Sequence, residues 1–366
     1  MLKMVCNRAA LDEAVGIVRP VVAARTPKPV LQCLKLSAGK DSLTLMATDL
    51  EVTIRFELTA VEVSGQGDAV VPADKFGEIV SKSTGETLAI SGEENALLVK
   101  SESARFKINS FPPADFPEAP AFDGTPDLTL NAGLLGQMIN KTIFATAKEH
   151  TRYAINGVLW EKTGKKLQLI ATDGRRLAKV SGPLIESAGK DQSAIVPVKA
   201  LLAIQRLLRE PDETVAVKFS ETQILFHTDR ASVTAQLVEG QFPKYQDVIP
   251  RECNRKAEAA TEELRIALTQ ASILTSEESK GVRLAFEPAE LTMSAHSAEA
   301  GEASVKCKID FQGDAMEIGF NPQYLMDALK VVGEATVTIE MQEPTKPGLV
   351  KAGHDFMYVV MPVNLG

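Results

Sequence analysis

Two glycine-containing segments are the first candidates for phosphate chemistry. Residues 182–191 end in Gly189-Lys190-Asp191, so an aspartate stands where a phosphate loop has the Ser or Thr that binds magnesium, and the glycine spacing also differs. Gly65-Gln66-Gly67 lacks a third glycine and precedes a predicted strand instead of a helix. Neither segment therefore predicts a nucleotide site.

Side chains that could bind a metal or act as nucleophiles are scattered along the chain. None of the histidines belongs to a zinc, protease or nucleophile-elbow signature; they are His150, His227, His296 and His354. The cysteines have no C-x-x-C spacing and no neighbouring histidine; they are Cys6, Cys33, Cys253 and Cys307. We expect no catalytic residue, no cofactor and no metal. An enzyme with scattered catalytic residues stays open as an alternative, because such residues leave no motif.

Composition is that of an ordinary globular protein. The 366 residues are 45% hydrophobic and 24% charged, and this length predicts two or three domains. Aromatic residues make up only 5%, which disfavours a base-stacking surface, and the net charge of -8 argues against nucleic acid. The cysteines are expected to be reduced and mostly buried, which predicts a cytoplasmic protein. We expect neither a signal peptide, since Asp12 and Glu13 interrupt the apolar residues near the start, nor a membrane span.

The elements that must position any site come from an internal repeat. Pro72, Pro197 and Pro322 each follow a predicted strand, precede a predicted helix and are 125 residues apart. Ala47-Thr48-Asp49 and Ala171-Thr172-Asp173 end strands 124 residues apart, and a diverged third copy includes Ala295. A third landmark is Gly157-Val158-Leu159-Trp160 against Gly281-Val282-Arg283-Leu284, again 124 residues apart. Three landmarks in register predict three copies of one domain of about 125 residues, at residues 1–122, 123–255 and 256–366.

Each copy is predicted to be α+β, with two helices packed on antiparallel sheet. Residues 36–46 and 52–63 alternate and are rich in β-branched types, so each predicts a strand. Leu201, Leu202, Ile204, Leu207 and Leu208 have helical spacing after Pro197. The order in each copy is expected to be helix, strands, helix, strands.

Positive charge is concentrated in the predicted helices. Residues 8–28, 74–82, 131–152, 198–210, 261–280 and 321–333 together carry +4, and the rest of the chain carries -12. If these helices share a surface, that surface could follow a phosphate backbone on an acidic protein. The candidate DNA contacts are Arg8, Arg25, Lys148, Arg152, Lys199, Arg206 and Arg209. The plainer interpretation is that these cations only solvate exposed helix faces.

Several segments resemble one family over the whole chain. The segment Ala171-Thr172-Asp173-Gly174-Arg175-Arg176-Leu177-Ala178 is similar to the signature of the bacterial DNA polymerase III beta subunits, the DNA sliding clamps. Residues 111–117, 152–157, 240–245 and 358–363 agree with this. The tetrapeptide at 173–176 alone would predict only a turn between strands.

The resemblance implies a clamp fold that forms a ring. Two chains would join head to tail, with helices lining a hole that encircles duplex DNA and sheets forming the outer wall. Only the lining would then need to be basic, which removes the conflict with the net charge. The resemblance places the dimer interface at Arg105 and Phe106 of one chain and at Ile273, Leu274, Glu299 and Glu302 of the other.

The resemblance also implies a non-catalytic processivity factor with a peptide pocket between the second and third domains. The pocket would receive short segments of the DNA polymerase III alpha subunit, the clamp loader, other polymerases and repair proteins. The matching positions are Ile155, Thr172, Gly174, Arg175, Arg176, Leu177, Pro243, Val248, Val359, Val360, Met361 and Pro362.

The chain departs from the family pattern at a few positions. Asp247 and Asn364 stand where the family often has basic residues, Gly366 is an additional residue, and Glu149 stands where a neutral DNA contact can occur. These changes could alter peptide preference and one DNA contact. A scaffold or adaptor that uses the same triplicated fold without DNA is the alternative from another class.

Overall fold

The computed structural model describes residues 1–119, 124–148, 154–275, 281–297 and 299–365, and its elements repeat three times. Each copy has a strand, a helix, five strands, a second helix and three strands. In the first copy these are β1 (Lys3–Asn7), α1 (Arg8–Val18), β2 (Cys33–Ala38), β3 (Leu43–Thr48), β4 (Val52–Leu58), β5 (Val61–Gly65), β6 (Gly67–Pro72), α2 (Ala73–Lys82), β7 (Thr87–Glu93), β8 (Ala96–Lys100) and β9 (Arg105–Asn109).

The second and third copies follow the same order. The second has β10 (Leu128–Asn131), α3 (Ala132–Ile143), β11 (Gly157–Thr163), β12 (Lys166–Thr172), β13 (Arg176–Pro183), β14 (Glu186–Ser187), β15 (Gln192–Pro197), α4 (Val198–Gln205), β16 (Thr214–Phe219), β17 (Gln223–His227) and β18 (Ala231–Gln236). The third has β19 (Arg255–Ala260), α5 (Thr261–Ala271), β20 (Val282–Glu287), β21 (Glu290–Ser297), β22 (Gly301–Lys308), β23 (Asp310–Gln312), β24 (Met316–Phe320), α6 (Pro322–Val331), β25 (Thr336–Met341), β26 (Gly348–Ala352) and β27 (Phe356–Val360).

Short 3-10 turns occupy some of the connections. These are η1 (Arg19–Val21), η2 (Pro29–Gln32), η3 (Pro113–Asp115), η4 (Tyr245–Val248) and η5 (Ser272–Leu274). Together with the helices and strands they confirm the predicted α+β class and the threefold repeat. The repeated prolines also lie where they were expected, because Pro72 and Pro197 cap α2 and α4 and Pro322 begins α6.

Several predicted elements were wrong in extent. The helices expected over 131–152, 198–210 and 261–280 end early, at Ile143, Gln205 and Ala271. Residues 36–46 contain a turn, in which the Gly39 N–H donates to the Ser42 carbonyl at 2.9 Å, so two strands form there. Residues 52–63 likewise divide into β4 and β5. The helix expected over 8–28 ends at Val18, since Pro20 has no N–H to continue the ladder.

The described chain divides into two compact units. One comprises Met1–Gly136, Leu184–Lys190 and Val196–Leu237, and the other comprises Gln137–Pro183, Asp191–Ile195 and Val238–Gly366. The second copy therefore contributes strands to both units. Each unit holds one nine-stranded antiparallel sheet and one smaller sheet.

Each nine-stranded sheet is built across two copies. In the first unit its order is β14-β10-β16-β17-β18-β4-β3-β2-β6, so β18 of the second copy pairs with β4 of the first. In the second unit the order is β15-β11-β12-β13-β27-β26-β25-β19-β23, so β27 of the third copy pairs with β13 of the second. We call the pairing of β18 with β4 the first join and that of β27 with β13 the second join.

The joins use equivalent strands and equivalent residues. The pairing registers from β10 to β18 and from β19 to β27 can be aligned residue by residue, which makes Val233 of β18 equivalent to Tyr358 of β27. Val233 faces Ile54 of β4, and Tyr358 faces Ala178 of β13. The same alignment leaves one strand of each kind at a sheet edge, namely the counterpart of β18 and β27 and the counterpart of β4 and β13. They are β9 in the first unit, which pairs with β8, and β22 in the second unit, which pairs with β21.

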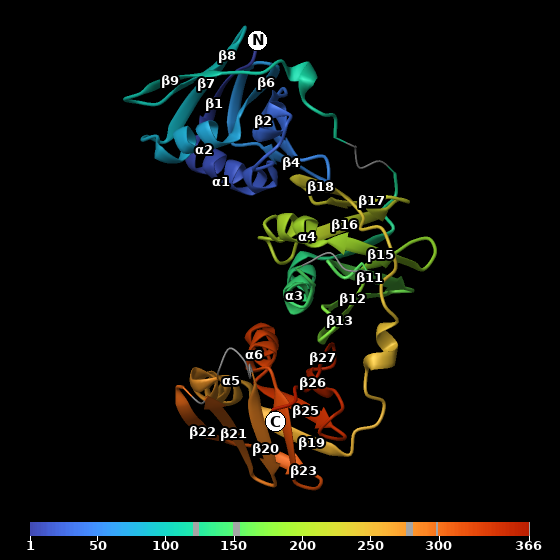
Figure 1. Ribbon diagram of the computed structural model, residues 1–366. Helices are drawn as coiled ribbons and strands as arrows, with labels where there is room; N and C mark the ends of the chain where they lie inside the picture. Colours follow the sequence, from blue (N-terminus) through green and yellow to red (C-terminus); the bar gives the residue numbers. More distant parts are fainter. Residues whose placement is uncertain (120–123, 149–153, 276–280, 298, 366) are drawn as a thin grey trace. The chain divides into compact units, whose positions relative to one another are not determined.

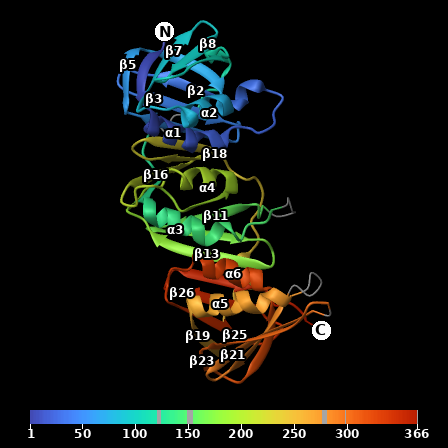
Figure 2. The same cartoon turned by 90° about the vertical axis from the view of Figure 1, so that its left-hand side faces the viewer.

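Helices cover the sheets of each unit. In the first unit α1 packs beside α2 and against β3 and β4 (Figure 1). In the second unit α5 packs beside α6 and against β21 and β22 (Figure 2). The buried faces supply the core, whose largest fully buried side chains include Trp160, Tyr358 and Phe76.

Close packing in the second unit gives a first prediction. A Cβ on Gly348 would lie 2.7 Å from Cζ of Phe320, whose ring is only 1% exposed. Gly348→Ala should therefore lower the free energy of unfolding by about 1–3 kcal/mol, as overpacking does in other cores. Gly333→Ala is the matched control, because a Cβ there meets nothing within 4 Å. Equal urea midpoints for the two variants would contradict the packing around Phe320.

Candidate functional site

An apolar cavity of about 200 Å³ lies at the second join, entirely within the second unit. One side is formed by the end of β12, the turn that follows it and the start of β13, and the opposite side by the segment before β19. The end of β27 closes it. Its lining residues are Ile155, Thr172, Gly174, Arg175, Arg176, Leu177, Pro243, Lys244, Tyr245, Val248, Val359 and Met361.

The floor of the cavity continues into the core. Leu177, Tyr245 and Val359 are buried in one hydrophobic cluster that also contains Leu159 and Ile170. Val248 and Met361 are 46% and 39% exposed, so apolar surface remains open at the mouth. The exposed side chains of Arg175 and Lys244 add positive charge at the edge. This arrangement suits an extended peptide with apolar anchor residues.

A tight turn presents Gly174 and Arg175 to the cavity. The Asp173 Oδ1 accepts the N–H groups of Arg175 and Arg176 at 3.0 and 3.1 Å. The Thr172 Oγ1 donates to the Arg176 carbonyl at 2.7 Å and accepts the Gly174 N–H at 3.1 Å. Gly174 has φ of 88°, a conformation that glycine adopts at little cost.

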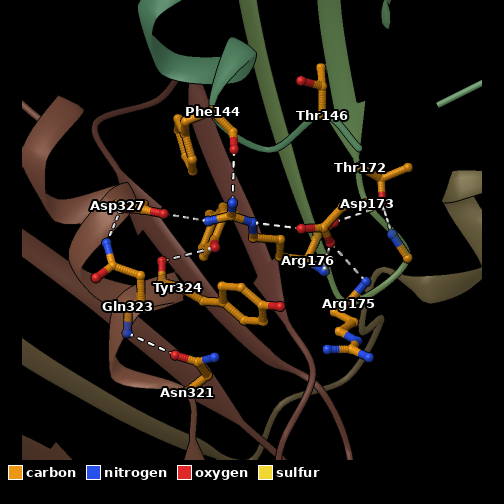
Figure 3. A network of polar contacts seen from close by, with 12 residues as sticks. Phe144, Thr146, Thr172, Asp173, Arg175, Arg176, Asn321, Gln323, Tyr324 and Asp327 are labelled. Atoms are coloured by element: carbon orange, nitrogen blue, oxygen red, sulfur yellow. Dashed lines mark hydrogen bonds and ion pairs between the residues drawn. The ribbon is translucent and has the colours of Figure 1, made fainter. Parts of the chain in front are cut away.

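The Arg176 side chain connects this turn to the third copy (Figure 3). Its Nε donates to Asp173 Oδ2 at 3.0 Å, Nη1 to Asp327 Oδ2 at 2.7 Å and Nη2 to the Phe144 carbonyl at 2.8 Å. The guanidinium also lies 4.6 Å from the centre of the Tyr324 ring. Burial lowers the pKa of Arg176, but its interactions with Asp327, Tyr358 and Asp173 outweigh this effect and hold the pKa above its ordinary value.

Tyr245 fixes the other side of the cavity. Its hydroxyl donates to Glu161 Oε2 at 2.7 Å, and the Lys179 ammonium lies 5.3 Å from its ring centre. Burial and the bond to Glu161 raise the pKa of Tyr245 above its ordinary value, so the hydroxyl stays protonated and can donate. The connecting segment is thereby held against the sheet, with Pro243 and Val248 turned to the cavity.

Ten of the twelve positions expected in a peptide pocket line this cavity. Val360 and Pro362 do not. Successive residues of a strand face opposite sides, so Val359 and Met361 face the cavity while Val360 is fully buried on the other side. Pro362 borders a second cavity of about 440 Å³ together with Arg283, Glu317 and Gly319.

Sequence reasoning missed two lining residues, Lys244 and Tyr245. Both lie in the segment 240–245 that carried part of the family resemblance. A tyrosine in a connection rich in Gly, Pro and polar residues was the signal that could have indicated a buried anchor.

The predicted DNA contacts are distributed over both units. Arg8, Arg25, Lys199, Arg206 and Arg209 belong to the first unit and Lys148 to the second, while Arg152 lies outside the described residues. Arg25, Arg206 and Arg209 are exposed. Lys199 is paired with Asp49, and the Arg209 guanidinium is 2.7 Å from Glu13 Oε1.

The residues expected at a dimer interface lie at two sheet edges. Arg105 and Phe106 are on β9 in the first unit. Glu302 is on β22 in the second unit, beside η5 with Ile273 and Leu274, and Glu299 lies in the turn before β22. Ile273 is 73% exposed, which is unusual for a large aliphatic side chain.

The described residues contain no cluster of three or more His, Cys, Asp or Glu side chains that could hold a metal ion. The four cysteines are free, and all but Cys253 are buried, as expected. Burial raises the pKa of the Cys6 thiol to about 12 and that of Cys33 to about 11. Among the helices that the structure describes, none is long and apolar enough to cross a membrane.

Comparison with known proteins decides the family. Three family models match in succession: the N-terminal domain of the DNA polymerase III beta subunit at residues 2–120, its central domain at 129–244 and its C-terminal domain at 246–364. The chain belongs to the DNA polymerase III beta subunit family, the beta sliding clamps. It is therefore a processivity clamp of DNA replication and not an enzyme.

Individual beta sliding clamps match over their full length. The clamp of Pseudomonas aeruginosa is 34% identical, with 98% of this chain and 99% of that protein covered. The clamp of Escherichia coli (strain K12) is 31% identical, with both chains fully covered. Among solved structures, the clamp of Bacillus subtilis has a TM-score of 0.94 at 26% identity, with 99% of each chain covered. A clamp structure from P. aeruginosa has a TM-score of 0.92 at 32% identity, with both chains fully covered.

Proposed function

We propose that this clamp acts as a ring-shaped homodimer that encircles duplex DNA, slides along it and tethers the replicative polymerase. The observation that carries the proposal is the pair of edges left by the two joins. Each chain presents β9 in the first unit and β22 in the second, which are the strand types that pair at both joins. A third join between two chains would pair β9 of one with β22 of the other.

The internal joins also supply the register of this contact. At the two internal joins, Thr234 faces Thr53 and Val359 faces Leu177. In the repeat, Lys107 of β9 occupies the position of Thr234 and Val359. Glu302 of β22 occupies the position of Thr53 and Leu177. Lys107 of one chain would therefore face Glu302 of the other, and Phe106 would face Ala303. Opposite charges at facing positions favour the pairing. Ile273 and Leu274, beside β22, would bury apolar surface near Phe106.

Such a contact is head to tail, and it closes a ring when two chains complete the rotation. The ring would contain six clamp domains, with residues 1–122, 123–255 and 256–366 as the domains of each chain. Arg8, Arg25, Lys148, Arg152, Lys199, Arg206 and Arg209 would face the DNA. Since Lys199 and Arg209 already bind carboxylates, direct affinity for phosphates would be modest.

Partners would dock at the cavity of the second join. The resemblance and the apolar lining support short peptide segments of the DNA polymerase III alpha subunit, the clamp loader, other polymerases and repair proteins as occupants. Ile155, Leu177, Val359 and Met361 would receive the apolar anchors. The predicted roles of Val360 and Pro362 would be indirect, because these residues support the strand end that carries Met361. We place this activity in the cytoplasm, where bacterial DNA is replicated.

Peptide binding at the cavity gives a second prediction. Met361→Asp should weaken binding of a fluorescent peptide from the alpha subunit by at least about tenfold, since a buried carboxylate would lose solvation on docking. The exposed Ile185, which belongs to the other unit and does not line the cavity, provides the control variant Ile185→Asp. Fluorescence anisotropy measures both affinities. Unchanged affinity in Met361→Asp would remove the cavity as the peptide site.

Retention on DNA gives a third prediction. A groove that binds by six to ten phosphate contacts loses roughly a thousand-fold in affinity between low and moderate salt. A closed ring keeps its hold on circular DNA through the same wash, because release needs an interface to open or an end to be reached. The protein should be loaded on nicked circles with its clamp loader, washed in high salt and divided. One cut that linearises the circle should release it.

The alternative outcomes separate the candidate functions. Equal retention on circles and linear DNA, or loss from both at the same salt, would show surface binding without encirclement. No retention on either, together with peptide binding, would favour an adaptor without DNA.

A further inference from the structure

The Arg176 guanidinium, beside the cavity, makes several contacts with other protein groups. Its side chain is 10% exposed and is bound to two carboxylates, one carbonyl and two aromatic rings. Figure 3 shows these partners converging on it from the turn, from the segment after α3 and from α6. Although Arg176 borders the cavity, its donors are directed to these protein groups and are not left for a ligand.

We propose that Arg176 is a positioning residue that holds the 172–176 turn in the shape that forms the peptide cavity. This inference rests on the proposed function of that cavity. The guanidinium neutralises Asp173, whose other oxygen fixes the turn through the Arg175 and Arg176 N–H groups. It ties the same carboxylate to Asp327 on α6, so the turn cannot move without breaking contacts with the third copy.

The 172–176 turn also fixes the position of Met361. The Arg175 carbonyl accepts the Met361 N–H at 2.9 Å, just beyond the last residue of β27. Gly174, Arg175 and Met361 are all lining residues of the cavity. One side chain therefore determines the relative position of three parts of the lining, which come from two copies of the repeat.

Comparison with the first join indicates that Arg176 serves the cavity and not strand pairing as such. The equivalent position in β4 is Val52, yet β4 and β18 pair over the same length of strand. Leu50, with φ of 78°, stands in place of Gly174, and the turn aspartate Asp49 binds Lys199 from α4. The pairing of copies forms without an arginine at this position.

The test compares two partly buried cations that each link the second and third copies. Arg176→Met removes the proposed positioning group. Lys141→Met removes the ion pair between Lys141 Nζ and Glu334 Oε1 at 3.1 Å, and neither residue lines the cavity. Arg176→Lys keeps the charge but cannot reach three acceptors in a fork. Asp327→Asn is a milder variant that weakens one of the three bonds and remains usable if Arg176→Met does not fold.

Binding of the fluorescent alpha-subunit peptide is the first readout, and amide hydrogen exchange at Gly174 and Met361 is the second. If the turn is competent in only a tenth of Arg176→Met molecules, the apparent Kd rises about tenfold. We expect that loss, a smaller loss in Asp327→Asn, little rescue by Arg176→Lys and faster exchange at both amides. Lys141→Met should keep wild-type affinity and exchange at these positions even if its melting temperature falls.

Three results would overturn the inference. Wild-type affinity in both Arg176→Met and Asp327→Asn would show that the turn needs no such support. Equal losses in Arg176→Met and Lys141→Met would show that any weakening of the second join acts on the cavity. If the unaltered protein does not bind the peptide at all, the assignment of the cavity fails and this inference fails with it.

Discussion

Main-chain pairing between strands of different copies is the constraint on which the rest of this structure depends. An edge strand exposes a row of unpaired N–H and C=O groups, and proteins cover such edges or pair them. Here β18 pairs with β4 and β27 with β13, which makes one continuous sheet from two copies in each unit. The same pairing rule, applied to β9 and β22, leads to the proposed ring.

The joins share a backbone plan but differ in their side chains. The first join has Val52 and an Asp49–Lys199 ion pair, while the second has Arg176 bound to Asp173 and Asp327. The cavity lies at the second join, where the turn contains Gly174 and the segment after β27 supplies Met361. The second join thus differs from the first in its turn and its side chains, and an apolar cavity lies there, while the order of the paired strands is the same.

The repeat and the first residues of the helices could be predicted from the sequence, because prolines and turn residues recur at nearly the same spacing. Strand boundaries were less predictable. The turn at Gly39–Ser42 lies in a segment whose alternation continues on both sides, and periodicity alone does not show where such a segment folds back. At the cavity the resemblance identified most of the lining, but not Tyr245, whose burial depends on Glu161 from a distant strand. The role of Arg176 was also inaccessible, since Asp327 is 151 residues away in sequence.

The register of the third join is the feature of the proposed ring that can be tested most directly. Lys107→Cys and Glu302→Cys in one chain would place facing cysteines across the proposed contact, at a Cα separation that antiparallel pairs and disulfides share. Both native side chains are exposed, whereas three of the four native cysteines are buried. The control joins Lys107→Cys with Ser304→Cys, which is two residues out of register.

Mild oxidation followed by non-reducing electrophoresis measures the outcome. If β9 and β22 close the ring in this register, the matched pair gives a covalent dimer in high yield, which reducing agent reverses, and the shifted pair stays largely monomeric. Absence of the dimer from the matched pair, or equal yields from both pairs, would contradict a ring closed by β9 and β22.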